Sequence, residues 1–301
     1  MSAKIGTPPL TYSASSMPQK IIAAHHTQTG TRECNEDAAS VHLPTGRVLA
    51  RKGMMAIMAD GVSGQQGHRD AAADAVRQLQ QAYYATPDDE PVPQVLERLI
   101  QTINQNLQAT ARATTLTTLV IRGPHYHCAH VGDSRLYRLR DNTLMQLTRD
   151  HAAHGPGLRH VLTRTLGRDP HVAIDHHAGA VHVGDVFLLV TDGAWGVLPD
   201  DELAWHIAEL AERKRSAEAT AKLVVDAAIA AESQDNISAL VLRVDDIDMT
   251  LAEAQRPDAN AQDAAPPCPA RDPLSFWKIV GMIALILNLL LFLLLITGTQ
   301  K

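Results

Sequence analysis

The sequence predicts an α+β fold: a sandwich rich in antiparallel strands, with its helices in separate blocks. Four short apolar runs bounded by turn residues predict buried strands, at 54–58, 116–121, 126–131 and 186–190. Apolar residues at helical spacing predict helices elsewhere. Because strands follow one another along the chain, a sandwich is favoured over a regular βαβ array.

The predicted helices lie between these runs or after them. The first has apolar side chains at Ala72, Val76, Leu79 and Tyr83, and the second has them at five positions between 96 and 107. A third helical region covers 201–231. Residues 134–147 predict a hairpin, because Asp141 and Asn142 form a typical turn pair.

Composition and charge exclude several classes of protein. The 301 residues are 45% apolar and 20% charged, which excludes wholesale disorder. The net charge is −6 and no run of Lys or Arg occurs, so we expect no nucleic-acid partner. The 15 His are scattered, without an HExxH motif, and are expected on the surface or in the core. The three cysteines, Cys34, Cys128 and Cys268, form no CxxC pair, which fits a reducing compartment.

The C-terminal region differs in composition from the rest. Residues 276–296 are almost all apolar, interrupted by Lys278 and Asn288. At about 1.5 Å per residue a helix of this length spans roughly 30 Å, the thickness of a bilayer core. A buried core helix is the alternative, but it would carry a polar stripe. We therefore expect a single-pass, tail-anchored membrane protein whose main domain is cytoplasmic. The predicted parts are an N-terminal tail (1–17), a main domain (18–244), a flexible linker (245–273) and a transmembrane helix (274–297).

Four acidic residues share one local design. Asp60, Asp133, Asp192 and Asp235 each stand at the end of a predicted buried strand. Any one of them is explained by turn chemistry, and we interpret Asp185 in VGDVF as such a turn. If the strands lie side by side, the four carboxylates converge and repel one another, which a divalent cation resolves. Oxygen-only ligands favour Mg²⁺ or Mn²⁺.

A further polar segment, RECNED, covers residues 32–37. The Arg32 guanidinium could bind a phosphate through two donors. The alternative is a surface ion pair with Glu36, and position in the sequence leaves both possibilities open.

Six motifs resemble those of the type 2C protein phosphatases, in the same order over residues 20–244. RECNEDAA resembles the R-x-x-N-E/Q-D motif, and MAIMADGVSG resembles the DGxGG motif. ATTLTTLVI and HCAHVGDSRLYRLRDNTLMQLTRDH resemble the GTT strand and the VGDSR hairpin. VFLLVTDGAWGVL and SQDNISALVL resemble the last two acidic motifs. The joined hairpin match makes this resemblance highly specific.

The resemblance implies a two-layer antiparallel β-sandwich flanked by helices, with two or three Mn²⁺ or Mg²⁺ ions in a cleft at one end. By motif position, Asp60 would bridge two ions and the Gly61 carbonyl would bind one. Asp192 and Asp235 would hold the other, and Asp133 a third. Asp37 and Glu36 would act directly or through water, and Arg32 would hold the phosphate.

The implied reaction is hydrolysis of phosphoserine and phosphothreonine in proteins by a metal-activated water. Two close cations lower the pKa of a bound water and neutralise charge on the phosphoryl group, so no protein nucleophile is needed. Cys34 is then expected to be a filler residue within a strand. The expected partners are phosphorylated proteins, the membrane, and a serine/threonine kinase on a separate chain.

Three positions depart from the family pattern. Ser63 and Ala113 replace glycines, and Val62 stands where some members carry a candidate general acid. We expect His151 to support a loop instead of replacing that acid. Ser63 and Val62 leave one alternative, a catalytically weak scaffold or binding protein at the membrane. A second alternative, which the catalytic motifs do not distinguish, is a phosphatase that resets a partner-switching protein.

Overall fold

The computed structural model describes residues 20–62, 71–153 and 161–247. All of them belong to one compact unit, Met1–Gln255. The described strands are β1 (Lys20–Gln28), β2 (Asp37–His42), β3 (Met54–Asp60), β4 (Leu116–Arg122), β5 (His125–Val131), β6 (Arg135–Arg140), β7 (Thr143–Gln146), β8 (Asp175–Ala180), β9 (Val186–Val190) and β10 (Ile237–Asp246). The described helices are α1 (Gly46–Lys52), α2 (Ala71–Ala85), α3 (Val92–Gln108), α4 (Asp192–Trp195), α5 (Asp200–Ala211) and α6 (Ala217–Ala230).

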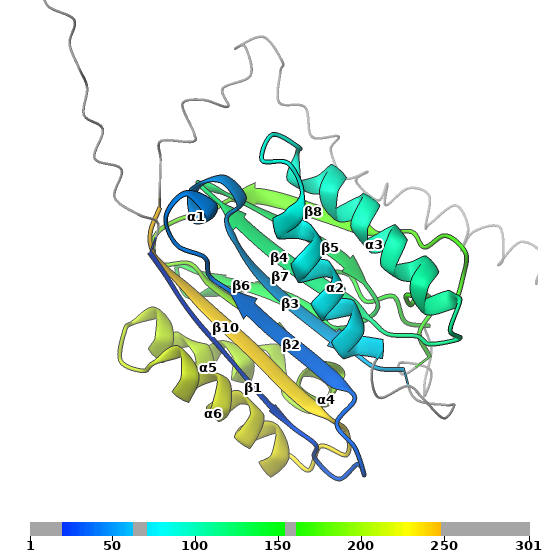
Figure 1. Ribbon diagram of the computed structural model, residues 1–301. Helices are drawn as coiled ribbons and strands as arrows, with labels where there is room; N and C mark the ends of the chain where they lie inside the picture. Colours follow the sequence, from blue (N-terminus) through cyan, green and yellow to red (C-terminus); the bar gives the residue numbers. More distant parts are fainter. Residues whose placement is uncertain (1–19, 63–70, 154–160, 248–301) are drawn as a thin grey trace, which may run out of the picture. The chain divides into compact units, whose positions relative to one another are not determined.

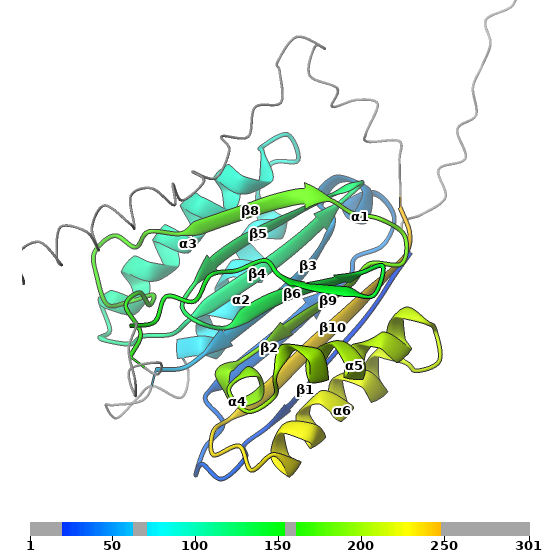
Figure 2. The same ribbon diagram turned by 180° about the vertical axis from the view of Figure 1, so that it is seen from behind.

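The strands form two antiparallel sheets that pack face to face. One sheet has the order β1-β10-β9-β6-β7 and the other β2-β3-β4-β5-β8. Helices α2 and α3 cover the outer face of the second sheet, while α5 and α6 cover the first (Figures 1 and 2). The predicted α+β sandwich, flanked by helices on both faces, is confirmed.

Strand β3 shows why apolar runs mark the central strands. Its residues alternate between two hydrophobic layers, and all but the last are buried. Met55, Ile57 and Ala59 face α2 and α3, whereas Met54, Ala56 and Met58 face the other sheet. Because a helix layer covers one face and a sheet the other, both sides of the strand must be apolar.

The predicted hairpin is confirmed in its turn as well as in its strands. Strands β6 and β7 pair in register from Arg140–Thr143 outward. Asp141 and Asn142 have φ angles of 49° and 58°. Two successive left-handed residues form the turn whose twist matches antiparallel strands.

The predicted helical region 201–231 is confirmed and consists of two helices, because Arg213 takes a left-handed conformation (φ 60°) and Ser216 caps the start of α6 through Ala219 N. One sequence-based expectation for local structure was wrong. Cys34 lies in the loop between β1 and β2, not within a strand. Its carbonyl accepts a hydrogen bond from the side chain of Asn236, which takes the place of sheet pairing there.

The structure tests the predicted C-terminal boundary of the main domain. Strand β10 continues to Asp246, two residues past the predicted end at 244. Its continuation is stabilised by Asp245, which accepts hydrogen bonds from Arg243 Nε (2.7 Å) and Nη2 (3.2 Å). The predicted tail, most of the linker and the transmembrane helix lie outside the described residues. Within the ranges that are described, no helix is both long and apolar enough to span a membrane.

Asp185 does form a turn, as predicted, but it also makes a buried ion pair. Its carboxylate is 1% exposed and accepts two hydrogen bonds of 2.6 Å from the Arg140 guanidinium. The same carboxylate accepts the backbone N–H of His182 at 2.8 Å. This group therefore connects β6 to the turn that leads into β9.

We predict that Asp185→Ala lowers the free energy of unfolding by about 2–3 kcal/mol, because it leaves Arg140 and the His182 N–H without their acceptor. The matched control is Asp226→Ala, which breaks an exposed pair with Lys222 and should cost less than about 0.5 kcal/mol. Urea denaturation of both variants measures the difference. Equal losses would show that the Asp185 pair does not stabilise the fold.

Candidate active site

Four predicted acids meet at one end of the sandwich. Asp60 ends β3, Asp133 follows β5, Asp192 opens α4 two residues after the end of β9, and Asp235 precedes β10. All four line one pocket of about 240 Å³. The other lining residues are Arg32, Glu36, Gly61, Val62, Leu162 and Asn236. The convergence predicted from the strand ends is therefore confirmed.

Asp37, the first residue of β2, lies beside this pocket. It pairs in register with Asp60 on the neighbouring strand. Its Oδ2 accepts hydrogen bonds from Thr191 Oγ1 (2.9 Å) and Ser238 Oγ (2.7 Å). Its Oδ1 is buried and has no hydrogen-bond partner among the described residues. A buried, unsatisfied carboxylate oxygen of this kind is suited to binding a cation.

The raised pKa values of three acids in and beside the pocket also indicate a site suited to a cation. Burial, with a smaller contribution from the charges of Asp192 and Asp235, raises the pKa of Asp37 to about 7, although the hydrogen bonds from Ser238 and Thr191 act to lower it. Burial and the charge of Asp37 raise the pKa of Asp60 well above its usual range. The pKa of Asp133 is likewise raised to about 7, first by burial and then by Asp192. The cluster thus carries more negative charge than its surroundings compensate.

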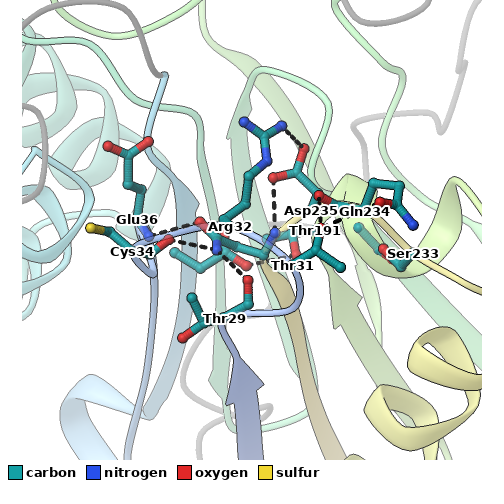
Figure 3. A network of polar contacts seen from close by, with 12 residues as sticks. Thr29, Thr31, Arg32, Cys34, Glu36, Thr191, Ser233, Gln234 and Asp235 are labelled. Carbon is teal, nitrogen blue, oxygen red and sulfur yellow. Dashed lines mark hydrogen bonds and ion pairs between the residues drawn. The ribbon is translucent and has the colours of Figure 1, made fainter.

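Arg32 compensates part of the negative charge of this cluster. Its Nη2 donates to Asp235 Oδ2 at 2.7 Å, and both side chains are partly exposed, at 49% and 38% (Figure 3). Arg32 therefore forms an ion pair, but the partner suggested by the sequence, Glu36, was wrong. As the side chains stand, no three His, Cys, Asp or Glu among the described residues are arranged to hold a metal ion. The Arg32 contact occupies one of the oxygens that such an arrangement would use.

Asn236 holds the loop that carries Arg32, and sequence reasoning missed it. Its Nδ2 donates to the carbonyls of Thr29 and Cys34, each at 2.8 Å. Its Oδ1 accepts the backbone N–H of Glu36, also at 2.8 Å. The only signal in the sequence is an Asp-Asn pair before a strand, which is also typical of an ordinary turn.

Close backbone contacts explain why glycines follow two of the acids. A Cβ at Gly61 would lie 2.8 Å from the Glu36 carbonyl oxygen, and one at Gly193 would lie 2.0 Å from that of Asn236. Any side chain at these positions would push apart the loops that carry the acids. The Asp-Gly pairs therefore serve the packing of the site as well as the turns.

Two threonines fix the position of Asp60. Thr115 Oγ1 accepts the Asp60 N–H at 2.9 Å, and Thr114 Oγ1 donates to the Asp60 carbonyl at 2.8 Å. The Thr115 N–H also donates to that carbonyl, at 2.8 Å. These contacts give the ATT segment a structural role that its place before a strand does not reveal.

His151 supports a loop, as predicted. Its ring Nδ1 accepts a hydrogen bond from the Gly132 N–H, and its backbone N–H donates to the Gly132 carbonyl. The Nδ1 contact leaves the ring proton on Nε2, which lies 3.1 Å from Asp175 Oδ2. His151 thus holds the residue before Asp133 and does not line the acidic pocket.

Val62 and Ala113, the two described residues that depart from the family pattern, are in contact. The Val62 N–H donates to the Ala113 carbonyl at 3.1 Å, and Val62 lines the acidic pocket. The third departure, Ser63, lies outside the described residues, so its expected effect on the adjoining loop stays a prediction.

Comparison with known proteins identifies a family that the chain matches. The model of the protein phosphatase 2C family matches residues 23–227. The chain is 29% identical to the serine/threonine phosphatase stp of Listeria welshimeri over 212 residues, which cover 62% of this chain and 82% of that protein. It is 28% identical to the serine/threonine protein phosphatase PstP of Mycobacterium tuberculosis, over 64% of this chain and 40% of that one.

Solved structures agree on the fold. PppA, a regulatory component of the T6SS in Pseudomonas aeruginosa, superposes with a TM-score of 0.63 at 27% identity, covering 74% of this chain and 97% of PppA. The catalytic domain of PstP in complex with two manganese ions superposes with the same TM-score at 24% identity, covering 75% of this chain and 99% of that domain.

We predict that saturating Mn²⁺ raises the Tm by about 5–10 °C at pH 7.5 and by less at pH 5.5. Because the folded-state pKa of Asp37 is raised to about 7, the folded protein binds more protons than the unfolded one between pH 4 and 7. The stability of the metal-free protein therefore falls as pH rises through this window, and protons compete with the ion at its lower end.

Thermal unfolding with and without MnCl₂ at the two pH values measures this effect. Asp60→Asn should lose most of the rise at pH 7.5, whereas Asp226→Asn, on the exposed face of α6, should keep it. An equal rise in wild type and Asp60→Asn would place the bound ion elsewhere.

Proposed function

The chain belongs to the protein phosphatase 2C family of serine/threonine protein phosphatases, and we propose that it removes phosphate from phosphoserine and phosphothreonine at the acidic pocket. The observation that carries this proposal is the convergence of Asp60, Asp133, Asp192 and Asp235 on one pocket. The unsatisfied Oδ1 of Asp37 beside it supports the same site.

We propose that these oxygens hold the divalent cations on which the family depends. Asp60 would serve two cation positions, the Gly61 carbonyl would serve one of them, and Asp192 and Asp235 would serve the other. Asp37 and Glu36 would contribute directly or through water, and Asp133 would serve a third, weaker position. The oxygen-only donor set favours Mn²⁺ or Mg²⁺ over softer metals.

Bound cations would lower the pKa of a water molecule and neutralise charge on the phosphoryl group. The remaining tasks fall to the chain itself. Arg32 lines the pocket with a half-exposed guanidinium, which suits it to bind two phosphate oxygens at once. With Asp235 acting as a ligand, Arg32 would exchange its carboxylate partner for the substrate phosphate. Asn236 keeps the Arg32 loop in place for that exchange.

We predict that the full-length chain in detergent hydrolyses p-nitrophenyl phosphate with Mn²⁺ or Mg²⁺ and not with EDTA. Asp60→Asn and Asp192→Asn should each lower kcat by about a hundredfold or more, because each removes a charge that would hold the cations. Arg32→Ala should mainly raise KM. Asp226→Asn is the matched surface control. Metal-dependent phosphate release from a phosphothreonine peptide extends the test to protein substrates.

The outcomes separate the proposal from its main alternative. Loss of activity in both aspartate variants, from folded protein, supports a metal-dependent phosphatase. No hydrolysis by folded wild-type protein with either metal would favour a scaffold or binding protein that keeps the fold.

We further propose that residues 274–297 anchor the protein in a membrane with the phosphatase domain on the cytoplasmic side. The sequence supports this through the apolar run 276–296 and through Trp277 and Lys278 at its start. Such an anchor would raise the effective concentration of membrane-bound phosphoproteins, including kinases on separate chains.

We predict that deletion of 275–301 moves the protein from the membrane fraction to the soluble fraction of cells. Deletion of 1–17 is the control and should leave the distribution unchanged. Fractionation followed by immunoblotting measures both. A truncated protein that stays with the membranes through a carbonate wash would contradict the anchor. Unchanged substrate dephosphorylation in cells after deletion of 275–301 would contradict a role for it in substrate access.

A further inference from the structure

A second pocket of about 510 Å³ adjoins the acidic one. Val62 and Leu162 line both pockets and form the wall that they share. Ala113 and Val161 complete an apolar lining. Pockets that bind ligands commonly have this size and are lined mostly by apolar side chains with a few polar groups.

This pocket gathers features that the phosphatase reaction does not use. Val62 and Ala113, two departures from the family pattern, both line it and are joined by a backbone hydrogen bond of 3.1 Å. Val161 is 51% exposed, although it is a large apolar residue. The acids at the phosphate position lie in the neighbouring pocket, so these apolar groups face something other than phosphate.

Backbone hydrogen bonds hold the walls in place. Leu166 exchanges two hydrogen bonds with Thr114, of 2.9 and 3.2 Å, and Ala153 N–H donates to the Val161 carbonyl at 2.8 Å. Thr114 also forms a β-bridge with Gly61, beside the acidic pocket. The apolar walls are thus fixed to the backbone that carries Asp60, which preorganises both pockets together.

Arg168 gives the pocket its charge. It lines the pocket, is exposed, and donates to the Leu162 carbonyl at 3.2 Å. It pairs with no carboxylate among the described residues, whereas the other lining arginine, Arg112, is paired with Asp74 at 2.6 Å. One uncompensated cation beside an apolar cavity favours an acidic group next to an apolar one.

We propose that this pocket binds a large apolar side chain of the phosphoprotein close to the phosphorylated residue, and that Arg168 favours an acidic residue beside it. The proposal rests on the proposed function, because the shared wall places the pocket next to the phosphate position. Val62, Ala113, Val161 and Leu162 are then specificity-determining residues, which act on substrate binding and not on the reacting atoms.

Phosphothreonine peptides test the proposal. Leu is compared with Ala at each position from −3 to +3, and kcat/KM is measured by phosphate release with the full-length chain in detergent. At one position or more we expect Leu to be preferred about tenfold, the effect of burying a few methylene groups. Val161→Asp should reduce that preference to less than about threefold.

Val183→Asp is the matched control, since Val183 is 57% exposed and lies in the turn before β9, whereas Asp192 follows the other end of that strand. It should keep the tenfold preference. A second comparison uses Asp against Lys beside the preferred Leu: wild type should favour Asp, and Arg168→Glu should reverse the order.

Hydrolysis of p-nitrophenyl phosphate, which has no flanking residues, keeps the two proposals distinguishable. If wild type hydrolyses it but shows no Leu preference at any position, the pocket does not bind substrate. The same conclusion follows if Val161→Asp and Val183→Asp keep equal preferences. If wild type hydrolyses neither p-nitrophenyl phosphate nor any peptide, the proposed function fails, and this inference fails with it.

Discussion

Repulsion among carboxylates held away from bulk water is the constraint on which the rest of this structure depends. Asp37 and Asp60 face each other across neighbouring strands, and Asp192 and Asp235 raise the pKa of both. Such a cluster opposes folding unless rigid elements hold it together. The two sheets and their helix layers provide that rigidity: apolar residues pack between the sheets and on both outer faces. The apolar layers therefore stabilise an end that would otherwise separate.

The site reduces this repulsion with groups of its own. Thr191 and Ser238 donate to one oxygen of Asp37, and Arg32 pairs with Asp235. The other oxygen of Asp37 receives no donor among the described residues. Compensation by these groups is thus partial, which suits the site to binding cations. The exposure of Arg32 matters here, because a buried pair would be hard to exchange for a ligand.

The sequence predicts the parts of the fold whose pattern is local. Strands such as β3 and β9 are apolar on both faces, and α2 and α3 show a clear helical period. Strands β1 and β8 contain two His each and pair with distant segments, β1 with residues 237–246, so no local pattern marks them. Acids at strand ends can likewise be found in the sequence by inspection. In contrast, the roles predicted for the RECNED segment (residues 32–37) depended on the family resemblance. The hydrogen bonds of Asn236 join residues 200 or more positions apart, and the Asp-Asn pair in the sequence does not distinguish them from an ordinary turn.

In the proposed function, the wall between the two pockets separates phosphoryl chemistry from recognition of the flanking residue. Val62 directly follows the Asp60–Gly61 pair, so a side chain at this position lies beside the phosphate position and beside whatever surrounds it. An imidazole there could exchange a proton with the leaving group, whereas a valine can only contribute apolar surface. The hydrogen bond from Val62 to Ala113 then fixes that surface relative to the threonines that hold Asp60. A change of residue at this position therefore alters the surface that both pockets share, whereas the hydrogen bonds that Thr114 and Thr115 make with Asp60 do not involve the valine side chain.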